Sequence, residues 1–73
     1  MSTPPPLPTH ELVEQLRDDK GLSVKSLASD AGMDRSTLQR RLDGLYPFKV
    51  PELAKIARVL EVPVASLIGE DAA

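Results

Sequence analysis

Hydrophobic residues recur along this chain at the three- and four-residue spacing of amphipathic α-helices. In residues 10–20, Leu12, Val13 and Leu16 fall on one side of a helix, and Gly21 follows as a helix stop. Similar stripes, bounded by capping or breaking residues, predict helices over residues 24–31, 35–43 and 51–60, and a fifth short helix after Pro63. No run alternates apolar and polar residues as a half-buried strand does. The pattern predicts an all-α fold.

The length of 73 residues allows one domain with one small core. Residues 1–9 contain four prolines, which favour neither helix nor sheet, so we expect a disordered arm there. Thr9, at the end of this arm, is the expected N-cap of the first helix. We expect the domain over residues 10–69 and a short tail over 70–73. The absence of cysteine and of any apolar run near 20 residues predicts a cytoplasmic protein without a membrane partner.

Residues 24–43 carry the signals of two helices joined by a tight turn. Ser23 and Asp34 precede the two helical patterns, and both residue types are good N-caps. Gly32 lies between the helices and can adopt the left-handed backbone conformation that ends a helix. Ala28 is small enough to let the two helices approach each other. This arrangement, with a second helix rich in Arg, Gln and Ser, predicts a helix-turn-helix.

The charged residues are unevenly distributed along the chain, so the net charge of −2 does not describe every part of it. An acidic chain argues against nucleic acid, because duplex affinity depends on neutralising phosphates. Between Lys20 and Lys49, however, six cations stand against three anions, a balance of +3. The rest of the chain has three cations and eight anions, or −5, which restores the total. We therefore expect a basic middle that docks through one face.

Two segments together resemble the lambda-repressor-like, Cro-type helix-turn-helix domains of phage repressors and bacterial regulators, also called the XRE family. They are LSVKSLASDAGMDRSTLQRRLDG at 22–44 and PELAKIARVLEVPVASLIG at 51–69. The resemblance covers about residues 10–69. It implies a compact five-helix fold with the third helix in the major groove of double-stranded DNA. It also implies a homodimer on a palindromic operator, and a function in transcription regulation, such as repression.

The helical periodicity of residues 35–43 selects the side chains that face away from the core. With Leu38 and Leu42 as the buried edge, the exposed face presents polar residues that match the family's base-reading positions: Arg35, Ser36, Gln39 and Arg40. Arginine pairs with guanine and glutamine with adenine through two hydrogen bonds, each pair contributing about 1–3 kcal/mol of discrimination. We expect Arg35 and Arg40 to read guanines.

Phosphate contacts are expected beside this face. Free N–H groups at a helix start bind anions, so Ser23 and Lys25 are candidates, as is Lys49 in the loop. Arg41 stands where the family usually has an apolar residue, and we expect its stem along the helix edge and its head on a phosphate. The family often dimerises through its fifth helix, which here would use Val64, Leu67 and Ile68.

Other functions find less support in the sequence. Tyr46 and Phe48 beside Pro47 could stack on bases, but we expect them to fill the gap between the third and fourth helices. His10, the sole histidine, is expected to be solvated, and we expect no metal, cofactor or catalytic residues. A protein-interaction module on the same scaffold, such as an antitoxin or antirepressor, is the alternative that the acidic ends favour.

Overall fold

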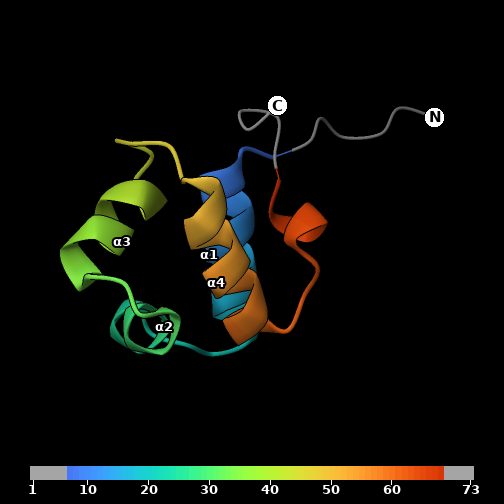
Figure 1. The fold of residues 1–73 in the computed structure, drawn as a ribbon, viewed down its shortest axis with the longest axis horizontal. Helices are drawn as coiled ribbons and strands as arrows, with labels where there is room; N and C mark the ends of the chain where they lie inside the picture. Colours follow the sequence, from blue (N-terminus) through green and yellow to red (C-terminus); the bar gives the residue numbers. More distant parts are fainter. Residues whose placement is uncertain (1–6, 69–73) are drawn as a thin grey trace.

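The computed structural model describes residues 7–68, and over this range it consists of helices joined by short turns (Figure 1). The helices are α1 (Thr9–Asp19), α2 (Val24–Ala31), α3 (Arg35–Leu42) and α4 (Val50–Leu60), followed by the 3₁₀ turn η1 (Val64–Leu67). The all-α prediction is confirmed. Residues 1–6 of the expected arm, and Gly69 with the expected tail, lie outside the described residues.

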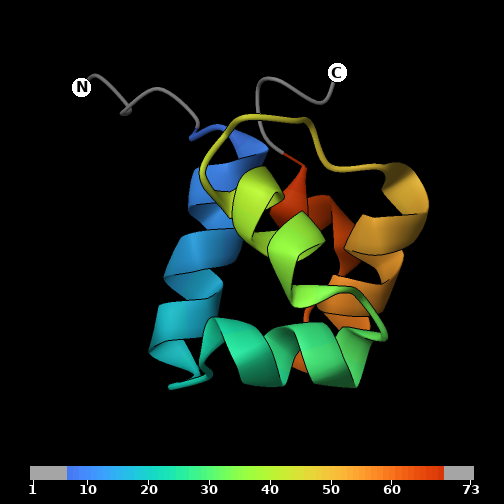
Figure 2. The same ribbon diagram turned by 90° about the vertical axis from the view of Figure 1, so that its left-hand side faces the viewer.

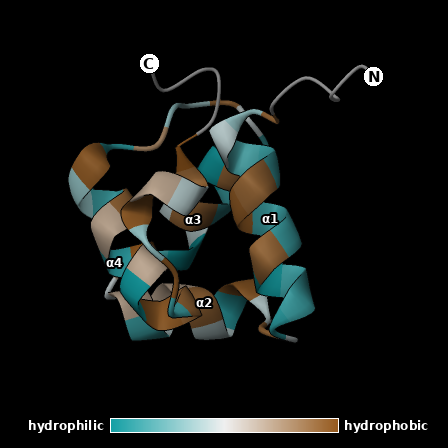
Figure 3. Cartoon of the chain, turned by 90° about the vertical axis from the view of Figure 1, so that its right-hand side faces the viewer, coloured by the Kyte–Doolittle hydropathy of each residue, from teal (hydrophilic) through white to brown (hydrophobic). Residues whose placement is uncertain are grey.

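The apolar stripes of all these elements meet in one core. α2 packs against α3 and α4, while α1 packs against α3 and η1. Hydrophobic and hydrophilic segments alternate along the helices, as expected where one side is buried (Figure 3). Each large core side chain contributes about 1.5–3 kcal/mol through its burial. The fully buried hydrophobic residues with large side chains are Val13, Leu27, Leu38, Ile56, Leu60 and Leu67.

The turn between α2 and α3 has the tight geometry that the sequence predicts. Gly32 has a φ of 68°, which lies in the left-handed region. The amide of Met33 then donates to the carbonyl of Ala28 at 2.8 Å, closing the end of α2. Ala28 is buried at 2% exposure. The two helices therefore cross steeply, and α3 lies on the outside of the molecule (Figure 2).

The predicted N-caps of α2 and α3 are confirmed, whereas the N-cap of α1 differs from the prediction. The Ser23 hydroxyl oxygen accepts from the Ser26 amide at 3.0 Å. The Asp34 carboxylate accepts from the Thr37 amide at 3.2 Å. Thr9 was expected as the N-cap, but the N-cap is Pro8, whose backbone is extended as an N-cap requires. Thr9 is instead the first residue of α1, and it is buried.

The last element is a correction to the five-helix expectation. Residues 64–67 form a single 3₁₀ turn instead of an α-helix. Pro63 fixes where this turn begins, and Ile68 has returned to an extended backbone with φ −82° and ψ 110°. Only four residues lie between these limits, a length typical of 3₁₀ segments. The turn places Leu67 into the core beside α1 and α4.

Candidate nucleic-acid interface

The outer face of α3 brings together the four residues that were predicted to read bases. All four are exposed, and together they line one shallow depression: Arg35, Ser36, Gln39 and Arg40. On the opposite side of the helix, Leu38 and Leu42 are 0% and 7% exposed. Their burial fixes the rotation of α3, so that its polar face points away from the core.

The two arginines of this face are free to bind a partner. Within residues 7–68 neither Arg35 nor Arg40 forms an ion pair or a side-chain hydrogen bond. A guanidinium that faces water in this way can offer its fork of donors to an acceptor pair. Gln39 is engaged differently, since its amide donates to Asp43 Oδ1 at 2.9 Å. Because this bond is exposed to water, breaking it costs little free energy.

Arg41, predicted to place its head on a phosphate, forms an ion pair with Glu52. Its Nε donates to Glu52 Oε1 at 3.0 Å, and its second donor reaches Oε2 at 3.3 Å. The two side chains are only 13% and 18% exposed. The guanidinium also lies 5.9 Å from the centre of the Tyr46 ring. Arg41 therefore joins α3 to α4, and its contact with a phosphate stays a prediction.

Glu52 is the residue of this site that sequence reasoning missed. Besides Arg41, its carboxylate accepts the amide of Lys49 at 2.8 Å, which fixes the start of α4. Burial raises the pKa of Glu52, but the hydrogen bonds from Arg41 and the Lys49 amide outweigh burial and hold that pKa below its usual value. The sequence did contain a signal for this role of Glu52: it stands three residues after Lys49, the N-cap of α4, which is the position of the acid in a capping box.

The remaining phosphate candidates occupy the expected positions. Lys25, in the first turn of α2, and Lys49, before α4, are both exposed. The Ser23 hydroxyl accepts the Ser26 amide and donates to Ser26 Oγ, so it caps α2 and is already engaged. The two lysines flank α3 along the chain, one before it and one after it.

The candidate dimer residues do not form a common surface. Leu67 is 0% exposed, so its assignment to an interface is wrong: it belongs to the core of a single chain. Val64 is half-buried and Ile68 is 48% exposed. An apolar pattern marks residues that leave water, but it does not say whether they meet their own core or a partner.

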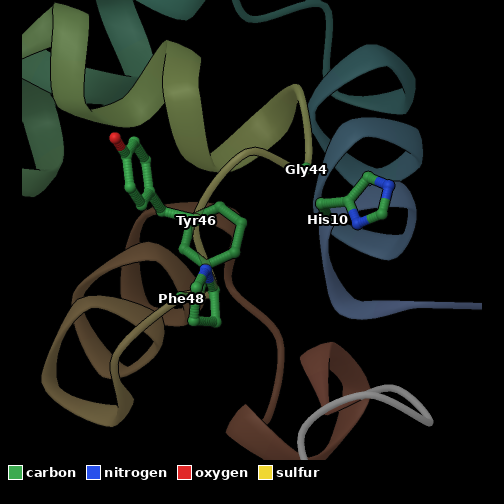
Figure 4. Close-up of a pocket in the computed structure, with 5 residues that line it drawn as sticks. His10, Gly44, Tyr46 and Phe48 are labelled. Carbon is green, nitrogen blue, oxygen red and sulfur yellow. The ribbon is translucent and has the colours of Figure 1, made fainter.

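The loop after α3 also departs from expectation. Phe48 is half-buried and packs against the core, as predicted, but Tyr46 is 55% exposed. His10 is half-buried rather than solvated, and it lies beside Gly44, where an added Cβ would meet its Nε2 at 3.2 Å (Figure 4). Gly44 has a φ of 79°, so the close approach and the backbone conformation both favour glycine.

The part of the chain that the structure describes contains neither a cluster of metal ligands nor a membrane-spanning helix. No group of three or more metal-ligating side chains occurs among residues 7–68. No helix in this range is long and apolar enough to cross a membrane.

Two helices that pack on one core, joined by a tight turn, with two exposed arginines on the second helix, are typical of a helix-turn-helix domain. Residues 11–67 match a family model described as a helix-turn-helix domain, and the chain belongs to this family. The match confirms the lambda-repressor-like resemblance. The protein is therefore a helix-turn-helix DNA-binding regulator, a class whose members are not enzymes.

Solved structures support the same assignment. The restriction-modification controller protein C.AhdI from Aeromonas hydrophila is 28% identical with a TM-score of 0.78, over 82% of this chain and 91% of that one. The N-terminal DNA-binding domain of SinR from Bacillus subtilis is 32% identical with a TM-score of 0.77, over 81% and 87%. A structure of SinR, a master regulator for biofilm formation, in complex with DNA matches at 32% identity and a TM-score of 0.77, over 81% and 95%. A comparison with curated protein sequences found no match.

Proposed function

We propose that this protein is a sequence-specific transcriptional repressor of the phage type, which places α3 in the major groove of double-stranded DNA. The observation that carries this proposal is the exposed face formed by Arg35, Ser36, Gln39 and Arg40, whose two arginines have no ion pair with any residue of the described range 7–68. The similar SinR structure in complex with DNA supports the choice of ligand. Repression needs only occupation of an operator, which this face provides.

In this mechanism the side chains of α3 have separate tasks. Arg35 and Arg40 donate to O6 and N7 of guanines, and Gln39 pairs with an adenine. Ser36 lies between the arginines, where a hydroxyl can donate to or accept from a base edge. Arg41 is assigned no base in this mechanism, because its guanidinium is paired with Glu52.

Phosphate contacts set the register of the complex. Lys25 and Lys49 supply charge before and after α3, and the free amides at the start of α2, beyond the Ser23 cap, bind an adjacent phosphate. Two copies on a palindromic operator would place their recognition helices in successive major grooves, about 34 Å apart.

Selection from random duplex DNA tests this function. The wild-type protein is titrated against the pool at two salt concentrations, and the retained duplexes are sequenced. We expect a palindrome, and we expect Arg40→Ala to lose one base preference in each half-site. Arg58→Ala, which removes an exposed arginine from α4, is the matched control and should recover the wild-type palindrome.

The acidic net charge favours one other function, a protein-interaction module on this scaffold. If no duplex is enriched at either salt concentration, the result would support that function instead. If Arg40→Ala weakens binding to all duplexes equally, Arg40 contacts a phosphate and not a base.

A further inference from the structure

Asp43 is an acidic residue at the end of α3, one helical turn after Gln39. It is exposed, and within residues 7–68 it forms no ion pair. Its carboxylate accepts the side-chain amide of Gln39, with Nε2 and Oδ1 2.9 Å apart. A carboxylate beside a DNA-binding face repels phosphates, and at the C-terminal end of a helix it also opposes the helix dipole. Its contact with Gln39 is the interaction that can offset these costs.

The backbone holds Asp43 in a fixed position relative to Gln39. The Asp43 amide donates to the Gln39 carbonyl at 2.9 Å. Beyond it, Gly44 has a φ of 79°, and the amide of Leu45 donates back to the carbonyl of Arg40 at 3.1 Å. This is the hydrogen bond of a Schellman motif, which closes the end of a helix. The carboxylate acceptor is therefore in place beside Gln39 before any DNA is bound.

The pairing leaves Gln39 with a defined set of groups for a base. A glutamine amide has two N–H donors and one carbonyl oxygen. Asp43 occupies one N–H, so one donor and one acceptor remain. In the major groove adenine presents one acceptor, N7, and one donor, the N6 amino group, whereas guanine presents two acceptors, N7 and O6. The remaining groups of Gln39 match adenine, while guanine would require both N–H groups.

We propose that Asp43 is a positioning residue, which keeps one N–H of Gln39 in the DNA complex and thereby makes Gln39 select adenine over guanine. This inference rests on the proposed function, in which Gln39 reads a base. In water the bond between the two side chains is cheap to break, but a base that contacts Gln39 displaces water from it. A carboxylate left without its donor there would be unfavourable, so the bond persists while the second N–H and the carbonyl oxygen meet the base.

The location of Asp43 suits this indirect role. Gln39 lines the shallow depression on the outer face of α3, whereas Asp43 follows the last residue of the helix and is its C-cap. The N-terminal residues of a recognition helix contact the base edges. Asp43 lies at the opposite end, so it acts on a base through Gln39.

The test is a measurement of base preference, in which each position of the selected operator is replaced in turn by the other bases. Gln39→Ala first identifies the position that Gln39 reads, because preference should be lost there alone. Asp43→Ala removes the acceptor, whereas Asp43→Asn removes the charge and keeps an oxygen that can accept from Gln39. Asp30→Ala, which removes an exposed acid from α2, is the matched control.

In the wild type, Asp43→Asn and Asp30→Ala, we expect adenine to be preferred over guanine at this position by about 5- to 150-fold, the discrimination of one pair with two hydrogen bonds. In Asp43→Ala both N–H groups are free, so guanine should be bound nearly as well as adenine. Both Asp43 variants should bind all duplexes more tightly than the wild type, because a negative charge near phosphates is removed. Their thermal midpoints should stay close to that of the wild type, which excludes unfolding as the cause.

Two results would overturn the proposal while the proposed function stands. One is a folded Asp43→Ala that keeps the wild-type preference for adenine. The other is an Asp43→Asn that loses this preference as Asp43→Ala does, since the charge and not the hydrogen bond would then decide it. If Gln39→Ala changes no base preference, the inference fails and base reading rests on the arginines. If the wild type selects no duplex, the proposed function fails, and this inference fails with it.

Discussion

Arg40 and Arg41 are adjacent in the sequence, but their guanidinium groups have different surroundings. Arg40 faces water on the α3 surface, whereas Arg41 is bound by the Glu52 carboxylate and lies against the Tyr46 ring. A helix turns by about 100° per residue, so neighbours point to different sides. Arg40 is therefore exposed on the surface, whereas Arg41 joins α3 to α4.

Because of this difference, the same substitution at the two arginines should change different properties: thermal stability at Arg41 and operator binding at Arg40. Arg41→Met should lower the midpoint of thermal unfolding, because it leaves the largely buried Glu52 carboxylate without its partner. Arg40→Met should leave the midpoint close to that of the wild type while it weakens operator binding. Differential scanning calorimetry and DNA titration separate the two effects, and a similar loss of midpoint in both variants would contradict the assignment.

Glu61 is the one described residue other than glycine with a positive φ, at 58°. It ends α4 in the left-handed conformation, and the Val62 amide donates to the Ala57 carbonyl at 3.0 Å as in the glycine-terminated helices. A side chain with a Cβ is strained there, by roughly 1–2 kcal/mol.

Glu61→Gly should therefore stabilise the protein by about 0.5–1 kcal/mol after the greater freedom of glycine in the unfolded chain is subtracted. For a domain of this size, the thermal midpoint should rise by several degrees, since about 1 kcal/mol corresponds to roughly 4–8 °C. Lys20→Gly, at a helix end with a φ of −85°, is the control and should bring no gain. A lower midpoint for Glu61→Gly would refute the strain argument.

At the scale of elements, the Arg41–Glu52 pair ties the end of α3 to the beginning of α4. Because the pKa of Glu52 is lowered in the folded state, the charged carboxylate stabilises the fold at pH values above its unfolded pKa of about 4.3. That stabilisation disappears as the pH falls through the lower, folded pKa.

Glu52→Gln should consequently be less stable than the wild type at neutral pH, with the difference shrinking below about pH 4. Urea unfolding at a series of pH values measures this. Glu14, whose pKa is lowered first by its hydrogen bond from Arg17, should follow the same direction with a smaller effect, because it is 46% exposed. A constant difference between Glu52→Gln and wild type across the series would contradict the prediction.

The elements also show how far the sequence determines the structure. α2, α3 and α4 begin and end within one residue of the predicted limits, since Ser23, Gly32, Asp34 and Pro51 act through their own backbone chemistry. The limits of α1 agree equally well, but its N-cap and the nature of η1 differ from the prediction, because helix caps and short helices depend on packing.

Contacts between distant residues could not be predicted in this way. Arg41 and Glu52 are eleven residues apart across a loop, so no helical periodicity links them. Leu67 was placed in an interface because a stripe of apolar residues looks the same in a core. The exposed face of α3 was predicted correctly, because Leu38 and Leu42 alone fix its rotation. Its role in base reading stays a prediction.

At the scale of the whole molecule, a chain with net charge −2 must bind a polyanion through local charge. The affinity for DNA should therefore fall steeply with salt, with log K decreasing by about 0.9 per unit of log salt concentration for each phosphate neutralised. Lys49→Ala should reduce that slope by about 0.9 and weaken all sequences equally. Lys55→Ala, an exposed change on α4, should leave the slope unaltered. An unchanged slope for Lys49→Ala would remove Lys49 from the interface.

The central claim, that the exposed face of α3 reads bases in the major groove, is tested most directly by methylation interference on the selected operator. Methylation of guanine N7 places a methyl group in the major groove, at the acceptor that Arg40 is proposed to use. We predict that methylation at one guanine in each half-site abolishes wild-type binding, and that Arg40→Ala becomes indifferent to methylation at that guanine alone. Wild-type binding that tolerates methylation at every guanine would contradict the claim.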